Sequence, residues 1–105
     1  MDRNIAETRN GDWLVLAVTG EVDLSWSQQL RAAVLRALGQ APSVAVRLDG
    51  VGYIDSSGIA ALVEGFQQAR ARNQPFVLLA PSQNVRAVLE LARLDRVFQI
   101  RDRLD

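Results

Sequence analysis

The sequence contains no histidine, no cysteine and no lysine, so all twelve of its basic residues are arginines. Without histidine there can be no Ser-His-Asp triad, and without lysine there can be no Ser-Lys dyad, Schiff base or phosphate-binding lysine of the P-loop kind. Disulfides and metal sites built from imidazole or thiolate ligands are excluded as well. Because these absences remove most covalent mechanisms, we expect a protein that is not an enzyme.

The charge balance and hydropathy are those of an ordinary globular domain. Twelve acidic residues balance the arginines, which are scattered from Arg3 to Arg103 without forming a block, so we expect no nucleic-acid partner. No apolar run approaches the roughly 20 residues needed to cross a bilayer, and the first residues lack a signal-peptide pattern. We therefore expect a cytoplasmic protein without membrane insertion, and the length predicts one domain over residues 1–105.

Strand-like and helix-like segments alternate along the chain. Nearly continuous apolar runs rich in strand-forming residues predict strands at 13–19, 44–48, 76–80 and 97–100. Apolar residues with helical spacing predict helices that follow Ser25, begin near Gly58 and follow Ser82, with both serines as N-caps. A weaker pattern predicts an antiparallel edge strand over 4–9, before a turn at Gly11-Asp12.

Repeated strand-helix-strand crossovers require parallel strands with helices packed on the sheet. The order of segments therefore predicts an α/β fold: a small sandwich with a mixed, mostly parallel sheet of four or five strands. We expect the strand at 13–19 to be covered on both faces, because its apolar run is almost uninterrupted.

The most informative motif is Asp55-Ser56-Ser57-Gly58, between the strand at 44–48 and the helix that follows. Loops at the carboxyl ends of strands collect functional groups in α/β folds. One aspartate or serine there is commonly only a helix cap, but this motif has more hydroxyls than a cap needs. A phosphate on a first-turn serine would face backbone N–H groups, so charge could change while the fold survives. Spacing alone does not choose between Ser56 and Ser57.

Several segments, in this order, resemble the STAS domains and most closely the bacterial anti-sigma factor antagonists. The resemblance runs from Gly11 to about Arg101. The segments that carry it are Gly20-Glu21-Val22-Asp23-Leu24, Leu48-Asp49-Gly50-Val51, Ile54-Asp55-Ser56-Ser57-Gly58-Ile59, and Pro81-Ser82 to Leu94 with Val97-Phe98.

This resemblance implies a switch that works by exchanging partners. The unphosphorylated protein would bind an anti-sigma factor that is also a GHKL-type serine kinase, phosphorylation would break the complex, and a PP2C-type serine phosphatase would restore it. The phosphoacceptor implied is Ser57, the second serine of the motif. Asp55 and Asp23 would shape the kinase-facing surface, Ser56 would help hold the loop, and Gly58 would provide space for close packing.

The chain departs from the family pattern at Ser25-Trp26, where a smaller residue usually starts the first helix. An exposed Trp26 would be a partner anchor, since such a ring can bury ~150–250 Å²; the alternative is that it packs under the adjacent loop. The expected partner surface therefore comprises Asp23, Ser25, Trp26, Asp55, Ser56, Ser57 and Gly58.

A second interpretation also fits the family, namely a small cytoplasmic STAS subunit of a lipid-transporting ABC complex. Such a subunit would need the fold but not the phosphoacceptor, so the serine at position 57 favours the switch. We expect no cofactor and no metal: Gly50-x-Gly52 imitates a dinucleotide fingerprint, but Asp55 takes the place of its third glycine and would repel a pyrophosphate. We expect a monomer when free, although nothing in the sequence excludes a dimer.

Overall fold

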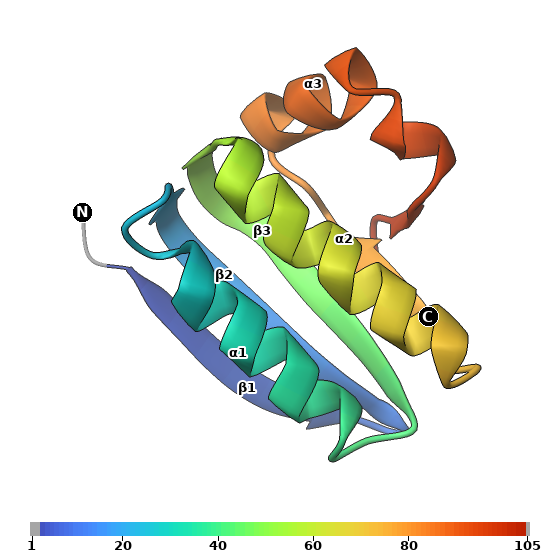
Figure 1. Cartoon of the computed structure of the whole chain (residues 1–105). Helices are drawn as coiled ribbons and strands as arrows, with labels where there is room; N and C mark the ends of the chain where they lie inside the picture. The colour runs from blue at the N-terminus through green and yellow to red at the C-terminus, as the bar shows by residue number, and fades with distance from the viewer. Residues whose placement is uncertain (1–2, 105) are drawn as a thin grey trace.

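A five-stranded sheet and three helices make up the computed structural model, which describes residues 3–104 (Figure 1). In chain order the elements are β1 (Asn4–Asn10), β2 (Trp13–Val22), α1 (Ser27–Leu38), β3 (Ser43–Ile54), α2 (Ser56–Ala71), β4 (Phe76–Leu79), α3 (Gln83–Leu91), a 3₁₀ turn (Leu94–Arg96) and β5 (Gln99–Arg101).

The strands lie in the order β1-β2-β3-β4-β5, and only β1 runs antiparallel to its neighbour. This confirms the mixed, mostly parallel sheet and the edge strand that the sequence predicted. The turn between β1 and β2 has two residues, with Gly11 at its first position and a φ of +62°. A glycine with positive φ at that position is typical of a type II′ hairpin turn, whose twist matches the strands it joins.

The helices α1 and α2 lie side by side over one face of the sheet, and α3 contributes to the same core above the end of β3 (Figure 1). Leu30 of α1, Leu62 of α2 and Leu89 of α3 are fully buried there. On the other face of the sheet, Val15, Ala45 and Leu79 form a small cluster, against which Trp13 and Leu104 pack. The strand at 13–19 is therefore apolar on both sides, but helices cover only one of them.

The sequence-based boundary of β3 is wrong by six residues. The strand expected to end at Leu48 continues to Ile54, and the helix expected near Gly58 begins at Ser56. The expected loop therefore shrinks to Asp55 alone. The extension pairs with the end of β2 after two shifts in register, and a Cβ on Gly50 would come within 2.7 Å of Thr19. Gly50 thus serves the close approach of two strands.

The contact between α1 and α2 depends on a small residue. Gly65 of α2 is buried, and a Cβ at that position would lie 2.5 Å from Cγ1 of Val34 on α1. The valine side chain is stiff because it is branched at Cβ, so it cannot easily move aside. Gly65 therefore sets the separation of the two helices.

Among residues 3–104, no helix has both the length and the apolar character needed to span a membrane.

Replacing Gly65 with alanine tests this packing. Alanine favours a helix by about 1 kcal/mol over glycine, yet overpacking a filled core costs roughly 1–3 kcal/mol. We expect Gly65→Ala to lower the free energy of unfolding by about 1 kcal/mol in urea denaturation. In a Val34→Ala background the same change should be neutral or stabilising. An equal loss in both backgrounds would show that Val34 is not the limiting contact.

Candidate functional site

Two neighbouring strand-to-helix junctions share one hydrogen-bonding arrangement, in which an aspartate holds the serine two residues further on. Oδ1 of Asp55 accepts from the backbone N–H of Ser57 at 2.9 Å and from its hydroxyl at 2.6 Å. Oδ1 of Asp23 accepts from the same two groups of Ser25 at 3.0 and 2.6 Å. Because β2 and β3 are adjacent and parallel, both arrangements lie at the same end of the sheet. We call them the two Asp-Ser clamps.

The Asp55 clamp also begins α2. Asp55 is the N-cap of the helix, and its Oδ1 accepts a further hydrogen bond from the N–H of Gly58 at 3.2 Å. The hydroxyl of Ser57 lowers the pKa of Asp55; desolvation opposes this shift, and the N–H groups of Gly58 and Ser57 add to it. The carboxylate is therefore ionised at neutral pH and holds the first turn of the helix together.

The two serines of the motif occupy different environments. Ser56 is exposed, and its hydroxyl has no hydrogen-bond partner in the part of the chain that the structure describes. Ser57 is half-buried, and its hydroxyl proton points at Asp55. The geometry therefore distinguishes two residues that spacing could not, because only one of them has a fixed hydroxyl.

The Asp23 clamp includes an arginine that the sequence analysis missed. Nη2 of Arg3 lies 3.1 Å from Oδ2 of Asp23, and Nη1 donates to Oγ of Ser25 at 2.8 Å. The hydroxyl of Ser25 lowers the pKa of Asp23, desolvation opposes this, and the charge of Arg3 lowers the pKa further. The charge of Asp55 acts in the opposite direction, which places the two carboxylates within electrostatic reach of each other.

The prediction that Ser25 caps the first helix is wrong. Trp26 occupies the N-cap position of α1 without a side-chain cap, because the hydroxyl of Ser25 is bound to Asp23. The backbone carbonyl of Asp23 instead accepts from the N–H groups of Trp26 and Ser27, at 3.0 and 2.9 Å.

A groove of about 230 Å³ runs between the first turns of α1 and α2. Ser57 lines this groove, and Leu24 stands beside it with 75% of its surface exposed. A single exposed apolar side chain is ordinary on a protein surface, so Leu24 is a candidate contact because of its position at the groove that Ser57 lines. The groove is lined by Leu24, Ser27, Gln28, Arg31, Ser57, Ala60, Ala61 and Glu64.

Leu24 is a candidate site residue that was not predicted from the sequence. The one feature that could have indicated it is an apolar residue placed between Asp23 and Ser25, just beyond the end of the strand. Opposite the clamps, Arg31 of α1 and Glu64 of α2 form an ion pair that ties the two walls of the groove together.

Trp26 and Gly58 complete the set of predicted residues. Trp26 is half-buried, packs against the core and lines a different groove, between α1 and β1. It is therefore not part of the wall that holds Ser57. Gly58 is buried, and a Cβ there would come within 2.7 Å of both Ile54 and Val22. This lack of a side chain lets α2 begin directly above the ends of β2 and β3.

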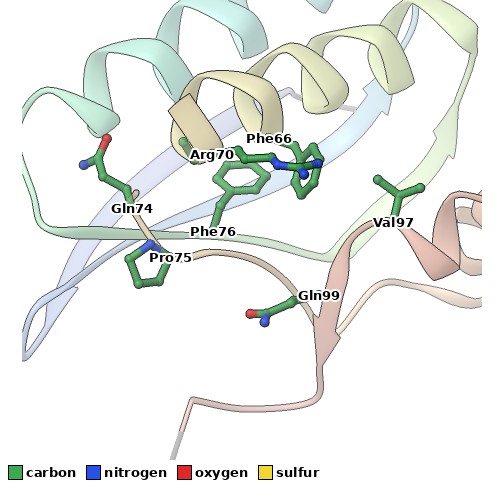
Figure 2. A pocket seen from close by; sticks show the side chains of 8 residues that line it. Phe66, Arg70, Gln74, Pro75, Phe76, Val97 and Gln99 are labelled. Carbon is green, nitrogen blue, oxygen red and sulfur yellow. The ribbon is translucent and has the colours of Figure 1, made fainter. Parts of the chain in front are cut away.

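A third concavity, of about 340 Å³, lies at the opposite end of α2 (Figure 2). Phe66, Phe76 and Val97 provide apolar walls, and its polar members are Arg70, Gln74 and Gln99. Because about ten residues of helix separate it from Ser57, it lies roughly 15 Å from the clamps and is not part of their site.

Across residues 3–104, no three carboxylates gather in a group that could hold a metal ion.

Comparisons with known proteins agree with this architecture. The family model described as "Mlab, STAS domain" matches residues 5–102. The chain is 26% identical over 96 residues to the anti-sigma-B factor antagonist of Listeria monocytogenes, covering 90% of this chain and 83% of that protein.

Two solved structures share the fold. An anti-sigma factor antagonist from Mycobacterium paratuberculosis has a TM-score of 0.89 at 21% identity, covering 99% of this chain and 89% of that one. The Bacillus cell fate determinant SpoIIAA in its phosphorylated form has a TM-score of 0.71 at 21% identity, covering 94% and 90%. The extent of the family match confirms the resemblance expected from the sequence motifs: this chain belongs to the STAS domain family.

Proposed function

We propose that this protein is an anti-sigma factor antagonist, a binding module without catalytic activity that is switched by phosphorylation of Ser57. The observation that carries the proposal is the Ser57 hydroxyl, held by Asp55 in the first turn of α2 and lining a groove beside the exposed Leu24. Relatives named as antagonists of anti-sigma factors support the partner class. The phosphorylated form of SpoIIAA supports phosphorylation as a property that this fold tolerates.

Ser57 is a better acceptor than Ser56 for two physical reasons. Its hydroxyl has one orientation, set by the 2.6 Å hydrogen bond to Asp55, whereas that of Ser56 is exposed and has no hydrogen-bond partner among the described residues. Only Ser57 lines the groove. A phosphate on Ser57 would therefore change the charge of the groove itself, while one on Ser56 would project into water.

Phosphorylation would remove the hydrogen bond from the Ser57 hydroxyl to Asp55 without destroying the fold. The modified Ser57 could no longer donate its proton to Asp55, and it would add a charge of about −1.5 to −2 at pH 7 beside that carboxylate. The positive end of the α2 helix dipole would offset part of this charge. The result is a folded protein whose groove has become strongly anionic.

The proposed partner is an anti-sigma factor with GHKL-type serine kinase activity, and a PP2C-type phosphatase would remove the phosphate. The partner would cover the two clamps and the groove between α1 and α2, with Leu24 as an apolar anchor in the bound state. We place this exchange in the cytoplasm, where sigma factors act. A STAS subunit of a lipid-transporting ABC complex remains the alternative, since it would use the same fold without needing the Ser57 hydroxyl.

The switch can be tested with four baits from the same chain: wild type, Ser57→Ala, Ser57→Asp and, as a matched control, Ser56→Asp. Each is used to capture proteins from the native bacterium, with identification and intact-mass measurement by mass spectrometry. We expect every bait except Ser57→Asp to retain an ATP-binding serine kinase, because only that substitution puts a charge in the groove. We expect one phosphate on wild type and none on Ser57→Ala.

The opposite result has a distinct meaning. If all four baits capture the same proteins, no bait carries phosphate and transporter subunits are among the captured proteins, Ser57 serves only the helix cap and the alternative assembly is correct. If Ser56→Asp releases the kinase and Ser57→Asp does not, the assignment of the acceptor is wrong.

Leu24 provides a test of the binding surface that does not involve phosphorylation. Because its side chain is 75% exposed, Leu24→Ala should leave the unfolding temperature unchanged. We expect it to weaken binding of the captured kinase by about tenfold or more, as for the loss of an apolar anchor. Leu91→Ala on α3, where 89% of the side chain is exposed, is the control and should bind like wild type. Calorimetric titration measures both; equal affinities would remove Leu24 from the interface.

A further inference from the structure

The outer edge of β1 is a long strand edge that no other strand covers among the described residues. β1 pairs with β2 residue for residue from Asn4 opposite Thr19 to Asn10 opposite Trp13, without a bulge. Proteins usually protect such an edge with a short strand, a proline, a bulge or charged side chains. β1 is seven residues long and has no proline and no bulge, so its protection rests on the charges of Glu7 and Arg9, whereas β5 at the other edge has only three residues.

The hairpin turn determines which backbone groups face outward. In a hairpin with a two-residue turn, the two residues that flank it, here Asn10 and Trp13, exchange both backbone hydrogen bonds. Alternate residues of β1 therefore bond to β2, and those between them direct their N–H and C=O groups away from the sheet. The outward-directed residues are Ile5, Glu7 and Arg9.

The charges on this edge are complementary to those on the same edge of a second copy. If a second copy of β1 lies antiparallel to the first with Thr8 on the two-fold axis, Glu7 of each copy faces Arg9 of the other. Both residues of each such pair direct their backbone groups outward, so each pair can exchange two hydrogen bonds. Sliding the strands by two residues would instead place Glu7 against Glu7 or Arg9 against Arg9, which is unfavourable. One register is thus favoured over its neighbours.

Neither charge has another strong partner in the described structure. Glu7 forms no ion pair within residues 3–104, and Arg9 makes only a long hydrogen bond, 3.4 Å, to the carbonyl of Gln40. Both side chains lie on the helix side of the sheet, opposite Leu16 and Leu14. On this side a groove of about 370 Å³ separates β1 from α1, which leaves room for the side chains of an added strand.

We infer that two copies of this chain associate through antiparallel pairing of their β1 strands, giving one continuous sheet with five strands from each copy. The chain would then be a two-fold dimer rather than the monomer expected from its sequence. The axis at Thr8 lies toward the hairpin end of β1, away from the clamps, so both copies keep the Ser57 groove open. The inference does not depend on the proposed function.

The expected affinity is modest. A single strand edge buries much less than the roughly 1,600 Å² of a standard stable interface. We therefore expect a dissociation constant in the micromolar range, so that the dimer is populated in concentrated solution.

The absence of cysteine makes the register directly measurable. In Thr8→Cys the two thiols would meet on the axis in a non-hydrogen-bonded pair, whose Cα atoms lie about 4.5 Å apart, within the range for a disulfide. We expect mild oxidation to convert this variant into a covalent dimer on a non-reducing gel. The control is Ala6→Cys, also exposed and on the same face of β1. In the inferred register its two thiols are about 13 Å apart and should not cross-link.

Charge reversal tests the pairing of Glu7 with Arg9. In the Thr8→Cys background, Glu7→Arg or Arg9→Glu alone should slow cross-linking at least several-fold, because each places like charges opposite each other. Mixing these two variants should restore the rate through a heterodimer, and so should the double variant Glu7→Arg/Arg9→Glu. Circular dichroism of each variant establishes that it is folded.

Two results would overturn the inference. One is cross-linking of Ala6→Cys as fast as that of Thr8→Cys, which would indicate random collision or another register. The other is sedimentation of the wild-type protein as a monomer at concentrations up to about 1 mM, well above the expected dissociation constant. Because neither measurement uses a kinase or a phosphate, loss of the dimer and loss of the Ser57 switch are separate outcomes.

Discussion

The interaction on which the rest of the site depends is the acceptance of three hydrogen bonds by one carboxylate oxygen. Oδ1 of Asp55 binds the N–H groups of Ser57 and Gly58 and the hydroxyl of Ser57. Because β3 ends at the preceding residue and α2 begins at the following one, no loop remains to absorb a change at this point. The same atom therefore starts the helix, joins it to the sheet and fixes the proposed acceptor. A modification of the Ser57 hydroxyl acts directly on this oxygen.

Much of this arrangement could be predicted from the sequence because it rests on local patterns. Apolar periodicity placed the three helices and the central strands, and the Asp-Ser-Ser-Gly motif correctly located the start of α2 to within two residues. The end of β3 could not be predicted, because Gly50 and Gly52 are typical of a turn. Only the partner strand reveals the role of Gly50: Thr19 of β2 occupies the space that a side chain there would fill.

The errors and omissions at the site have a common physical origin, which is competition between partners distant in the chain. Ser25 has the right chemistry for an N-cap, but its hydroxyl is hydrogen-bonded to Asp23 and Arg3 instead. The position of Arg3 follows from the pairing of β1 with β2, which brings this arginine beside the Asp23 clamp. The exposure of Leu24 and the partial burial of Trp26 likewise depend on how α1 packs, and no local pattern encodes either.

The arginines near the groove explain why a phosphate there would act as a strong signal. Arg31 is already paired with Glu64 across the groove, and Arg3 is paired with Asp23 at the neighbouring clamp. A phosphate on Ser57 would have to compete with these carboxylates for a counterion, since Arg31 is the one basic residue among those that line the groove. The backbone N–H groups of α2 carry only a partial charge, about half a unit at a helix end. Most of the added negative charge would therefore remain at the surface, where an approaching partner has to desolvate it.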